Sequence, residues 1–239
     1  GGAFGISIVD VDGDAHRDIV AMSATAGDKQ VTVWRSRDAS ASSFDERPLL
    51  PLNNTLEPTG FAVADVTGVS ALDIVLALDD TSASTDVIRI RTGRTDGGFD
   101  PLADVGQVDK PTGIATANLE GTSRAEIVVA TSGTGAALTV FQANTAGSAF
   151  DTHVIEPAAL SCTATAVGDL DGDGDVDIAV ACGLNQLRVY RNPGSLAASW
   201  PMVQLGAGGK NYGRVVIADM NGNGQDEIVA TTTAGVIEW

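Results

Sequence analysis

The stretch Asp169-Leu-Asp-Gly-Asp-Gly-Asp-Val-Asp177 decides the fold of this chain. It places carboxylates at positions 1, 3, 5 and 9 of a nine-residue loop, with glycine at positions 4 and 6. Carboxylates this close repel one another unless a cation lies among them, and alternating hard oxygen ligands suit Ca²⁺. A calcium loop between helices needs a bidentate Glu at position 12, which here is Val180, and both flanks are short and apolar. The stretch is therefore predicted to be a calcium-binding turn between two β-strands.

The same nine-residue frame recurs five times, and we number these loops 1 to 5. Position 4 is Gly, position 9 is acidic and the next residue is Ile in every copy. The first positions are separated by 55, 53, 51 and 50 residues. Such a near-constant period indicates a propeller or a stacked array. The first positions are Asp10, Asp65, Asn118, Asp169 and Asp219.

Each repeat divides into four strand-like runs, and no stretch has convincing helical periodicity. The first run is rich in small residues, as expected for crowded strands around a propeller axis. The second and third runs carry the Val, Ile and Leu that would fill the space between blades. In repeat 4 the runs are 163–168, 177–182, 186–190 and 200–205. The fourth run opens on an aromatic residue in repeats 1 to 4: Phe44, Phe99, Phe150 and Trp200.

These patterns predict an all-β fold, a β-propeller of five four-stranded repeats whose last blade lacks its outer strand. We expect a single domain around one axis, although five repeats of a larger ring would give the same pattern. The end of the chain, 235–239, should then be an unpaired edge strand, and edge strands are templates for pairing with another chain. The expected blades are approximately 2–56, 57–109, 110–160, 161–210 and 211–239.

Two segments resemble the FG-GAP/VCBS class of β-propeller repeats, which occurs in integrin α-subunit heads, propeller lectins and many secreted bacterial proteins. They are Ala166-Val-Gly-Asp-Leu-Asp-Gly-Asp-Gly-Asp-Val-Asp-Ile178 and Val189-Tyr-Arg-Asn-Pro-Gly194. The resemblance covers essentially the whole chain and implies a calcium-binding propeller. It leaves the function open, because this fold hosts lectins, adhesion modules, scaffolds and parts of polysaccharide-degrading enzymes.

The five loops differ in the ligands that they offer. Loops 1, 4 and 5 are predicted to bind about three Ca²⁺ ions, and loop 5 should bind more weakly because two of its ligands are charged rather than four. Loop 2 has Val69 at position 5 and loop 3 departs from the pattern at three places, so we expect both to be empty. For every loop the alternative is a plain solvated turn. The predicted ligands, with a backbone carbonyl at position 7, are Asp10, Asp12, Asp14, His16 and Asp18; Asp169, Asp171, Asp173, Asp175 and Asp177; and Asp219, Asn221, Asn223, Gln225 and Glu227.

The net charge and the hydropathy of the chain limit the classes of partner that it is expected to bind. The net charge of −17 disfavours nucleic acids and anionic lipid, and no apolar run is long enough to span a membrane. No signal peptide is seen and the chain does not begin with Met, so we expect a mature or excised segment of a secreted or cell-surface protein. Cys162 and Cys182 would lie nearly opposite each other on one hairpin, and we favour a disulfide over two buried thiols.

The sequence offers little for catalysis. His16 lies in a loop and His153 alternates along a predicted strand, and neither has a nucleophile motif nearby. We therefore expect no enzyme but an extracellular calcium-stabilised module that recognises glycan or protein, in adhesion or surface scaffolding. The alternative is part of a secreted carbohydrate-active enzyme such as a polysaccharide lyase, and a second copy or chain could pair with the edge at Val236–Trp239. Four aromatic residues could stack on sugars, although packing between blades is favoured: Trp34, Phe141, Tyr190 and Trp239.

Overall fold

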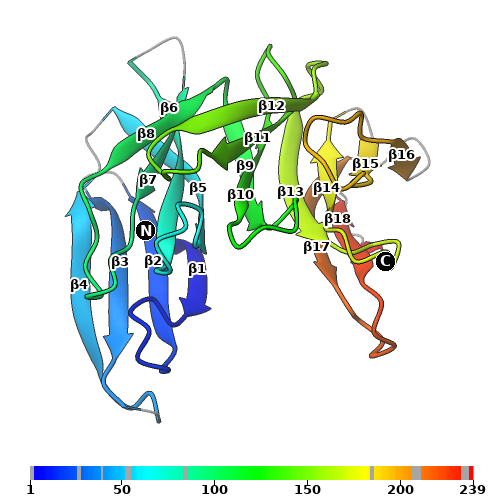
Figure 1. Cartoon of the computed structure of the whole chain (residues 1–239). Coiled ribbons are helices and arrows are strands. Elements are labelled where there is room, and N and C mark those ends of the chain that lie inside the picture. Colours follow the sequence, from blue (N-terminus) through cyan, green and yellow to red (C-terminus); the bar gives the residue numbers. More distant parts are fainter. Residues whose placement is uncertain are drawn as a thin grey trace.

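The structure is a computed structural model that describes residues 3–25, 28–38, 40–51, 55–82, 86–183, 186–205, 211–232 and 237–238. These ranges form nineteen β-strands in five antiparallel sheets, and no helix occurs in them (Figure 1). Consequently the described ranges contain no helix that could cross a bilayer. The predicted all-β propeller is confirmed.

Each sheet is a meander in chain order, and we number the sheets 1 to 5. The first strands are β1 (Ala3–Val9), β5 (Leu56–Ala64), β9 (Pro111–Ala117), β13 (Cys162–Gly168) and β17 (Tyr212–Ala218). The second strands are β2 (Asp18–Thr25), β6 (Asp73–Asp80), β10 (Glu126–Thr131), β14 (Asp177–Cys182) and β18 (Glu227–Thr232). The third strands are β3 (Asp28–Ser36), β7 (Asp86–Arg91), β11 (Leu138–Ala143), β15 (Gln186–Tyr190) and β19 (Ile237–Glu238). The fourth strands are β4 (Phe44–Pro51), β8 (Ala103–Val108), β12 (Phe150–Glu156) and β16 (Met202–Leu205).

Sheet 5 contains three strands within the described residues, as the sequence predicts. Its last strand, β19, pairs with β18 through Ala230 opposite Glu238 and Thr231 opposite Ile237. The remainder of the predicted edge, residues 235–236 and 239, lies outside the described residues, so its pairing with another chain stays a prediction.

Two of the fourth strands begin later than predicted. β8 begins at Ala103 and β16 at Met202, rather than at Phe99 and Trp200. In both cases a proline comes between, and proline has no backbone N–H to donate to a ladder. Phe99 makes an isolated bridge to Gly93, and Trp200 is buried in the core between sheets 3 and 4.

The first strands surround the propeller axis, and their small residues let them approach one another closely. A Cβ added to Gly5 of β1 would lie 2.8 Å from the ring of Phe61 on β5. A Cβ added to Gly60 would lie 2.9 Å from Ile114 on β9. Both separations are too short for a side chain, so large residues of one strand fill the space that glycine leaves on the preceding strand. The expectation of a crowded inner strand is therefore confirmed.

Four apolar clusters join the five sheets in sequence. β10 and β14 are buried along their whole lengths and β6 over residues 73–78, and alternate residues of each strand face opposite neighbours. In β14, for example, Ile178 and Val180 pack towards sheet 3, whereas Ala179 and Ala181 pack towards sheet 5. Among the described residues no buried apolar cluster joins sheet 5 back to sheet 1. The inner strands at the two ends consequently expose Ile6 by 64% and Val216 by 56%.

The hairpin of β13 and β14 is cross-linked. Cys162 and Cys182 are paired in the ladder and form the favoured disulfide. Phe141 and Tyr190 are fully buried in the clusters between sheets, as expected for packing residues. Trp34 is half-buried, and Trp239 lies outside the described residues. The two third-strand aromatics that are buried therefore belong to the core and present no face to a sugar.

Candidate metal loops and central pocket

All five nine-residue loops join the first strand of a sheet to the second, so they lie at one end of the propeller. Position 4 has a positive φ in every loop, between 64° and 80°, where glycine carries no steric penalty. In loops 1, 3, 4 and 5 a Cβ at this position would meet no atom within 4 Å. There the backbone angle, rather than a lack of space, requires glycine.

The acidic residues at positions 1 and 9 hold the loop backbone. In loop 4, Asp169 accepts hydrogen bonds from the N–H groups of Gly172 (2.8 Å) and Gly174 (3.0 Å). Asp177 accepts one from the N–H of Leu170 (3.1 Å) and one from Asn192 (2.8 Å). The bond from position 2 to the position 9 carboxylate recurs in all five loops. These two acids therefore have a structural role that does not depend on a metal.

The residue at position 3 distinguishes loops 1 and 4, where it is an aspartate, from the other three loops. In loop 1 the carboxylates of Asp10, Asp12 and Asp18 offer oxygen atoms within 4.8 Å of one another. In loop 4 Asp169, Asp171 and Asp177 do the same. Burial raises the pKa of the position 9 carboxyl in both loops, and the neighbouring acids at positions 3 and 5 raise it further. Clusters of acceptor-only oxygens fit Ca²⁺, so the donor sets of loops 1 and 4 suit the predicted ion.

In loops 2, 3 and 5 a neighbouring side chain donates a hydrogen bond to the acidic residues of the loop. In loop 2 the hydroxyl of Thr67 donates to Asp73 at 3.0 Å. In loop 3 the amide of Gln142 donates to Glu120 at 2.6 Å and approaches Glu126 at 3.4 Å. In loop 5 the amide of Asn221 donates to Glu227 at 2.5 Å. A hydrogen-bond donor thus lies where an ion would otherwise neutralise the acid.

The predicted ligands at position 5 accept backbone hydrogen bonds within their loops. Asp14 and Asp173, at position 5, accept backbone bonds from His16 and Asp175 and lie outside the three-acid clusters. In loop 5, Asn223 accepts a bond from the N–H of Gln225, and Asp219 accepts three backbone N–H groups. The carbonyl ligands at position 7 and the ions at loops 1, 4 and 5 stay predictions.

An arginine stands beside each of the two acidic clusters. The guanidinium of Arg35 lies 3.6 Å from Asp12, and that of Arg191 lies 3.7 Å from Asp171. Each cation comes from the end of a third strand or just beyond it, so it approaches position 3 from the same side. These arginines neutralise part of the clustered charge and would compete with an ion bound there.

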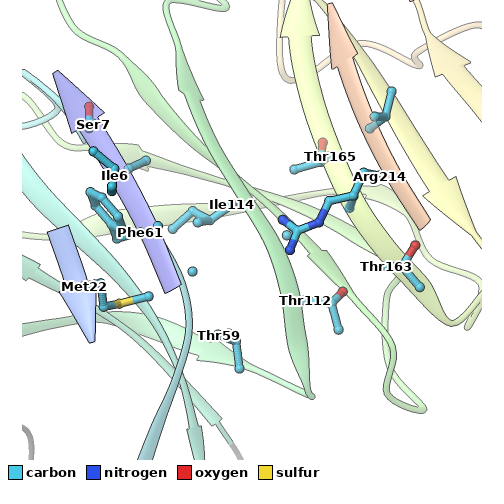
Figure 2. Close-up of a pocket in the computed structure, with 16 residues that line it drawn as sticks. Ile6, Ser7, Met22, Thr59, Phe61, Thr112, Ile114, Thr163, Thr165 and Arg214 are labelled. Atoms are coloured by element: carbon cyan, nitrogen blue, oxygen red, sulfur yellow. The ribbon is translucent and has the colours of Figure 1, made fainter. Parts of the chain in front are cut away.

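A pocket of about 320 Å³ lies on the axis and is lined by residues from all five first strands (Figure 2). Such a volume is at the lower end of the roughly 300–1,000 Å³ typical of ligand sites. Among the described residues that line it, Arg214 is the one charged side chain. Figure 2 shows its guanidinium extending from β17 into the pocket, in the direction of Ile114.

Threonine hydroxyls form part of the pocket wall. Thr59, Thr112 and Thr163 occupy equivalent positions at irregularities in the first strands, and each donates to a carbonyl of its own second strand. The hydroxyls of Thr112 and Thr163 also reach carbonyls of the next sheet, Cys162 at 2.6 Å and Tyr212 at 3.1 Å. Their protons point at the protein, so their free lone pairs can accept bonds from a ligand.

Sequence reasoning missed this pocket. Its signal lies in the register of the repeats, which puts threonine at one position of three first strands. At the next position the repeats have Gly5, Gly60, Gly113 and Ala164, and the fifth repeat has Arg214. The sequence signal for the pocket is therefore Arg214, a large cationic residue at a position where the other four repeats have glycine or alanine.

Comparison with known proteins supports the fold. Residues 169–230 match the FG-GAP-like repeat. The predicted resemblance is therefore confirmed, and the match covers loops 4 and 5. No curated protein sequence matches the chain.

Solved structures with the same fold include two of exo-β-1,3-galactanase from Phanerochaete chrysosporium. One contains galactose, and the other is a Glu-to-Ala variant with β-1,3-galactotriose. Their TM-scores are 0.58 and 0.59, at 11% sequence identity in both cases. The chain is covered over 97% of its length but spans 56% of theirs.

These neighbours correct one expectation. The sequence predicts a protein that is not an enzyme, but two of the solved structures that share its fold are glycosidases. A propeller with few histidines and no nucleophile motif is therefore no reason to exclude an enzyme, since this architecture carries carbohydrate chemistry elsewhere.

Proposed function

We propose that this chain is the sugar-binding propeller of a secreted carbohydrate-active enzyme, and that the central pocket receives the sugar. The observation that carries the proposal is the pocket itself, because all five first strands contribute to it and sugar-sized ligands suit its volume. The fold of the two galactanase structures supports the same reading. The disulfide between Cys162 and Cys182 supports secretion, since such bonds persist in oxidising compartments.

The pocket suits a polyol. The hydroxyls of Thr112, Thr163 and Thr165 donate to backbone carbonyls and keep lone pairs that can accept bonds from sugar hydroxyls. Arg214, which lines the same pocket, supplies donors to sugar oxygens. Hydrolysis of a glycoside commonly uses two carboxylates, and the described lining contains none. We therefore assign the binding of sugar to these residues and assign no acid or base.

Calcium at loops 1 and 4 is the second part of the proposal. The clustered acids there would hold the ion, which would supply positive charge and fix the ends of neighbouring first and second strands. Loop 5 is a weaker candidate because the amide of Asn221 already satisfies Glu227. The loops lie beyond the ends of the first strands, so the ion would act on the shape of the pocket rather than on the sugar.

A direct test measures binding and turnover separately. Calcium-loaded protein is titrated with β-1,3-galacto-oligosaccharides and with oligouronates, and the release of reducing or unsaturated sugar is followed in parallel. Binding to the pocket predicts that Thr163→Val weakens sugar affinity severalfold. A matched change on an outer strand, Thr152→Val on β12, should leave affinity unchanged. If no sugar of either class binds, the proposal is wrong.

A further inference from the structure

We propose that the central pocket selects a sugar that carries a carboxylate, and that Arg214 pairs with that group. This inference rests on the proposed function and names the class of substrate. It begins from an imbalance of charge, because the chain has 31 acidic and 14 basic residues, yet the described lining contains one charged side chain and it is basic.

Arg214 is free to bind. Most arginines of the described chain are held by a carboxylate or a carbonyl, for example Arg188 by Glu156 at 2.7 Å and Arg89 by Asp104 at 2.7 Å. The backbone N–H of Arg214 donates to Thr231 at 3.1 Å, but within the described residues its guanidinium has no hydrogen bond or ion pair. An exposed cation without a partner in so acidic a protein is available to an anionic group.

The packing of the propeller explains why an arginine fits at this position. In the other first strands the equivalent residues are small because a neighbouring strand packs against them, as Phe61 does against Gly5. No first strand packs against the other side of β17 among the described residues, so a long side chain can extend from it into the pocket (Figure 2). The same absence leaves Val216 exposed on this strand.

Chemistry then selects the ligand. A guanidinium presents two parallel N–H groups that match the two oxygens of a carboxylate, and this fit is better than for a single hydroxyl. The threonine hydroxyls nearby act as acceptors, which suits the hydroxyl groups of the same sugar ring. A sulfated sugar offers the same charge with a different shape, so it serves as the distinguishing probe.

The experiment uses sugars that differ at one carbon. Methyl galacturonoside and methyl galactoside are titrated into the calcium-loaded chain by calorimetry or ligand-observed NMR, together with galactose 6-sulfate. We expect the uronate to bind at least tenfold more tightly than the neutral sugar, and its affinity to fall as salt rises. Arg214→Ala should remove that preference, and Arg214→Lys should restore part of it, because lysine keeps the charge but not the fork.

Arg47 provides a matched control, since it is an exposed arginine on the outer strand β4 of sheet 1. Arg47→Ala removes the same charge and should leave the preference intact. Equal binding of uronate and neutral sugar, with no effect of Arg214→Ala, would overturn this inference while leaving sugar binding in place. Equal losses in both variants would also overturn it, because they would indicate only the overall charge. Tighter binding of the sulfate than of the uronate would reject the carboxylate, and no binding by any of the sugars would reject the proposed function itself.

Discussion

Loop 4 and loop 2 are built on the same backbone frame, yet they balance their charge in different ways. In both loops the position 1 aspartate accepts bonds from the N–H groups of positions 4 and 6. In both, the position 9 aspartate accepts the N–H of position 2. At position 3, loop 4 has Asp171, a third acceptor, whereas loop 2 has Thr67, a donor.

The comparison teaches which acids in such a repeat report a metal. Acids at positions 1 and 9 accept backbone N–H groups in loops 2 and 4 alike, so their presence does not distinguish a calcium site from a structural turn. The residue at position 3 decides whether the cluster is left with an excess of negative charge. We propose that a cation relieves that excess in loop 4, whereas in loop 2 the hydroxyl of Thr67 donates its proton to Asp73.

The largest expected effect is that of removing calcium. Binding of an ion to the native state stabilises it by about 2.7 kcal/mol per site when free calcium is 100 times Kd. With sites at loops 1 and 4, and a shift of roughly 2–4 °C per kcal/mol for a domain of this size, chelation should lower Tm on the order of 10 °C or more. Calorimetry with excess calcium or excess chelator measures this, and superimposable melting curves would sink the assignment.

The next effect separates the two loops. Asp171→Ala should remove the stabilisation of one site in calcium, about 2–3 kcal/mol, and should change little in chelator. Thr67→Ala, at the equivalent position of loop 2, should cost about 1 kcal/mol with or without calcium, because it removes one hydrogen bond to Asp73. Urea unfolding of both variants in both conditions tests the contrast. A calcium-dependent loss in Thr67→Ala would show that the loops do not differ as described.

A conversion would sharpen the comparison further. Thr67→Asp gives loop 2 the three acids of loop 4, since Asp65 and Asp73 are already present. In chelator the new carboxylate faces Asp73 without a donor, and we expect a loss of about 1–3 kcal/mol. Added calcium should recover part of that loss, whereas it should add no stability at loop 2 of the wild type. Failure of calcium to stabilise this variant would mean that position 3 alone does not create a site.

The smallest effect concerns the arginine beside loop 4. Arg191 lies 3.7 Å from Asp171 and its side chain is 52% exposed, so its interaction is largely screened. Arg191→Ala should raise the calcium affinity of loop 4 by less than about 1 kcal/mol, or roughly fivefold. Arg89→Ala, which breaks an ion pair on sheet 2, is the control and should leave calcium affinity unchanged. Weaker calcium binding in Arg191→Ala would contradict competition between the two cations.

Local patterns predicted most of the fold. The repeat of loops located all five sheets, and the second strand of repeat 4 was bounded correctly at 177–182 because an acid fixes its start and the apolar run its length. The fourth strands were placed less well, since Pro101 and Pro201 delay the ladder beyond the aromatic residues. A rule about proline would have corrected this from the sequence.

The site was less predictable because it depends on contacts between repeats. The acids of loops 2 and 3, where no ion was expected, had no role assigned from the sequence, although their persistence already indicated a role other than binding a metal. The internal donors are of two kinds: Thr67 lies inside its loop, whereas Gln142 comes from a third strand more than fifteen residues away. The pocket is formed by five strands that the chain brings together only on folding.

The lack of an apolar cluster between sheets 5 and 1 also affects where the molecule opens locally. Sheets 2 to 4 are packed on both sides, but sheet 5 is packed on one. Its second strand β18 is only partly buried, whereas β10 and β14 are buried throughout and β6 is buried over residues 73–78. Amide hydrogen exchange should therefore be slowest in the middle sheets and fastest in sheet 5, with opening that starts at the end and spreads inward. Because Arg214 lies on β17 of that same sheet, a sugar bound to it would stabilise the segment that opens most readily and slow its hydrogen exchange.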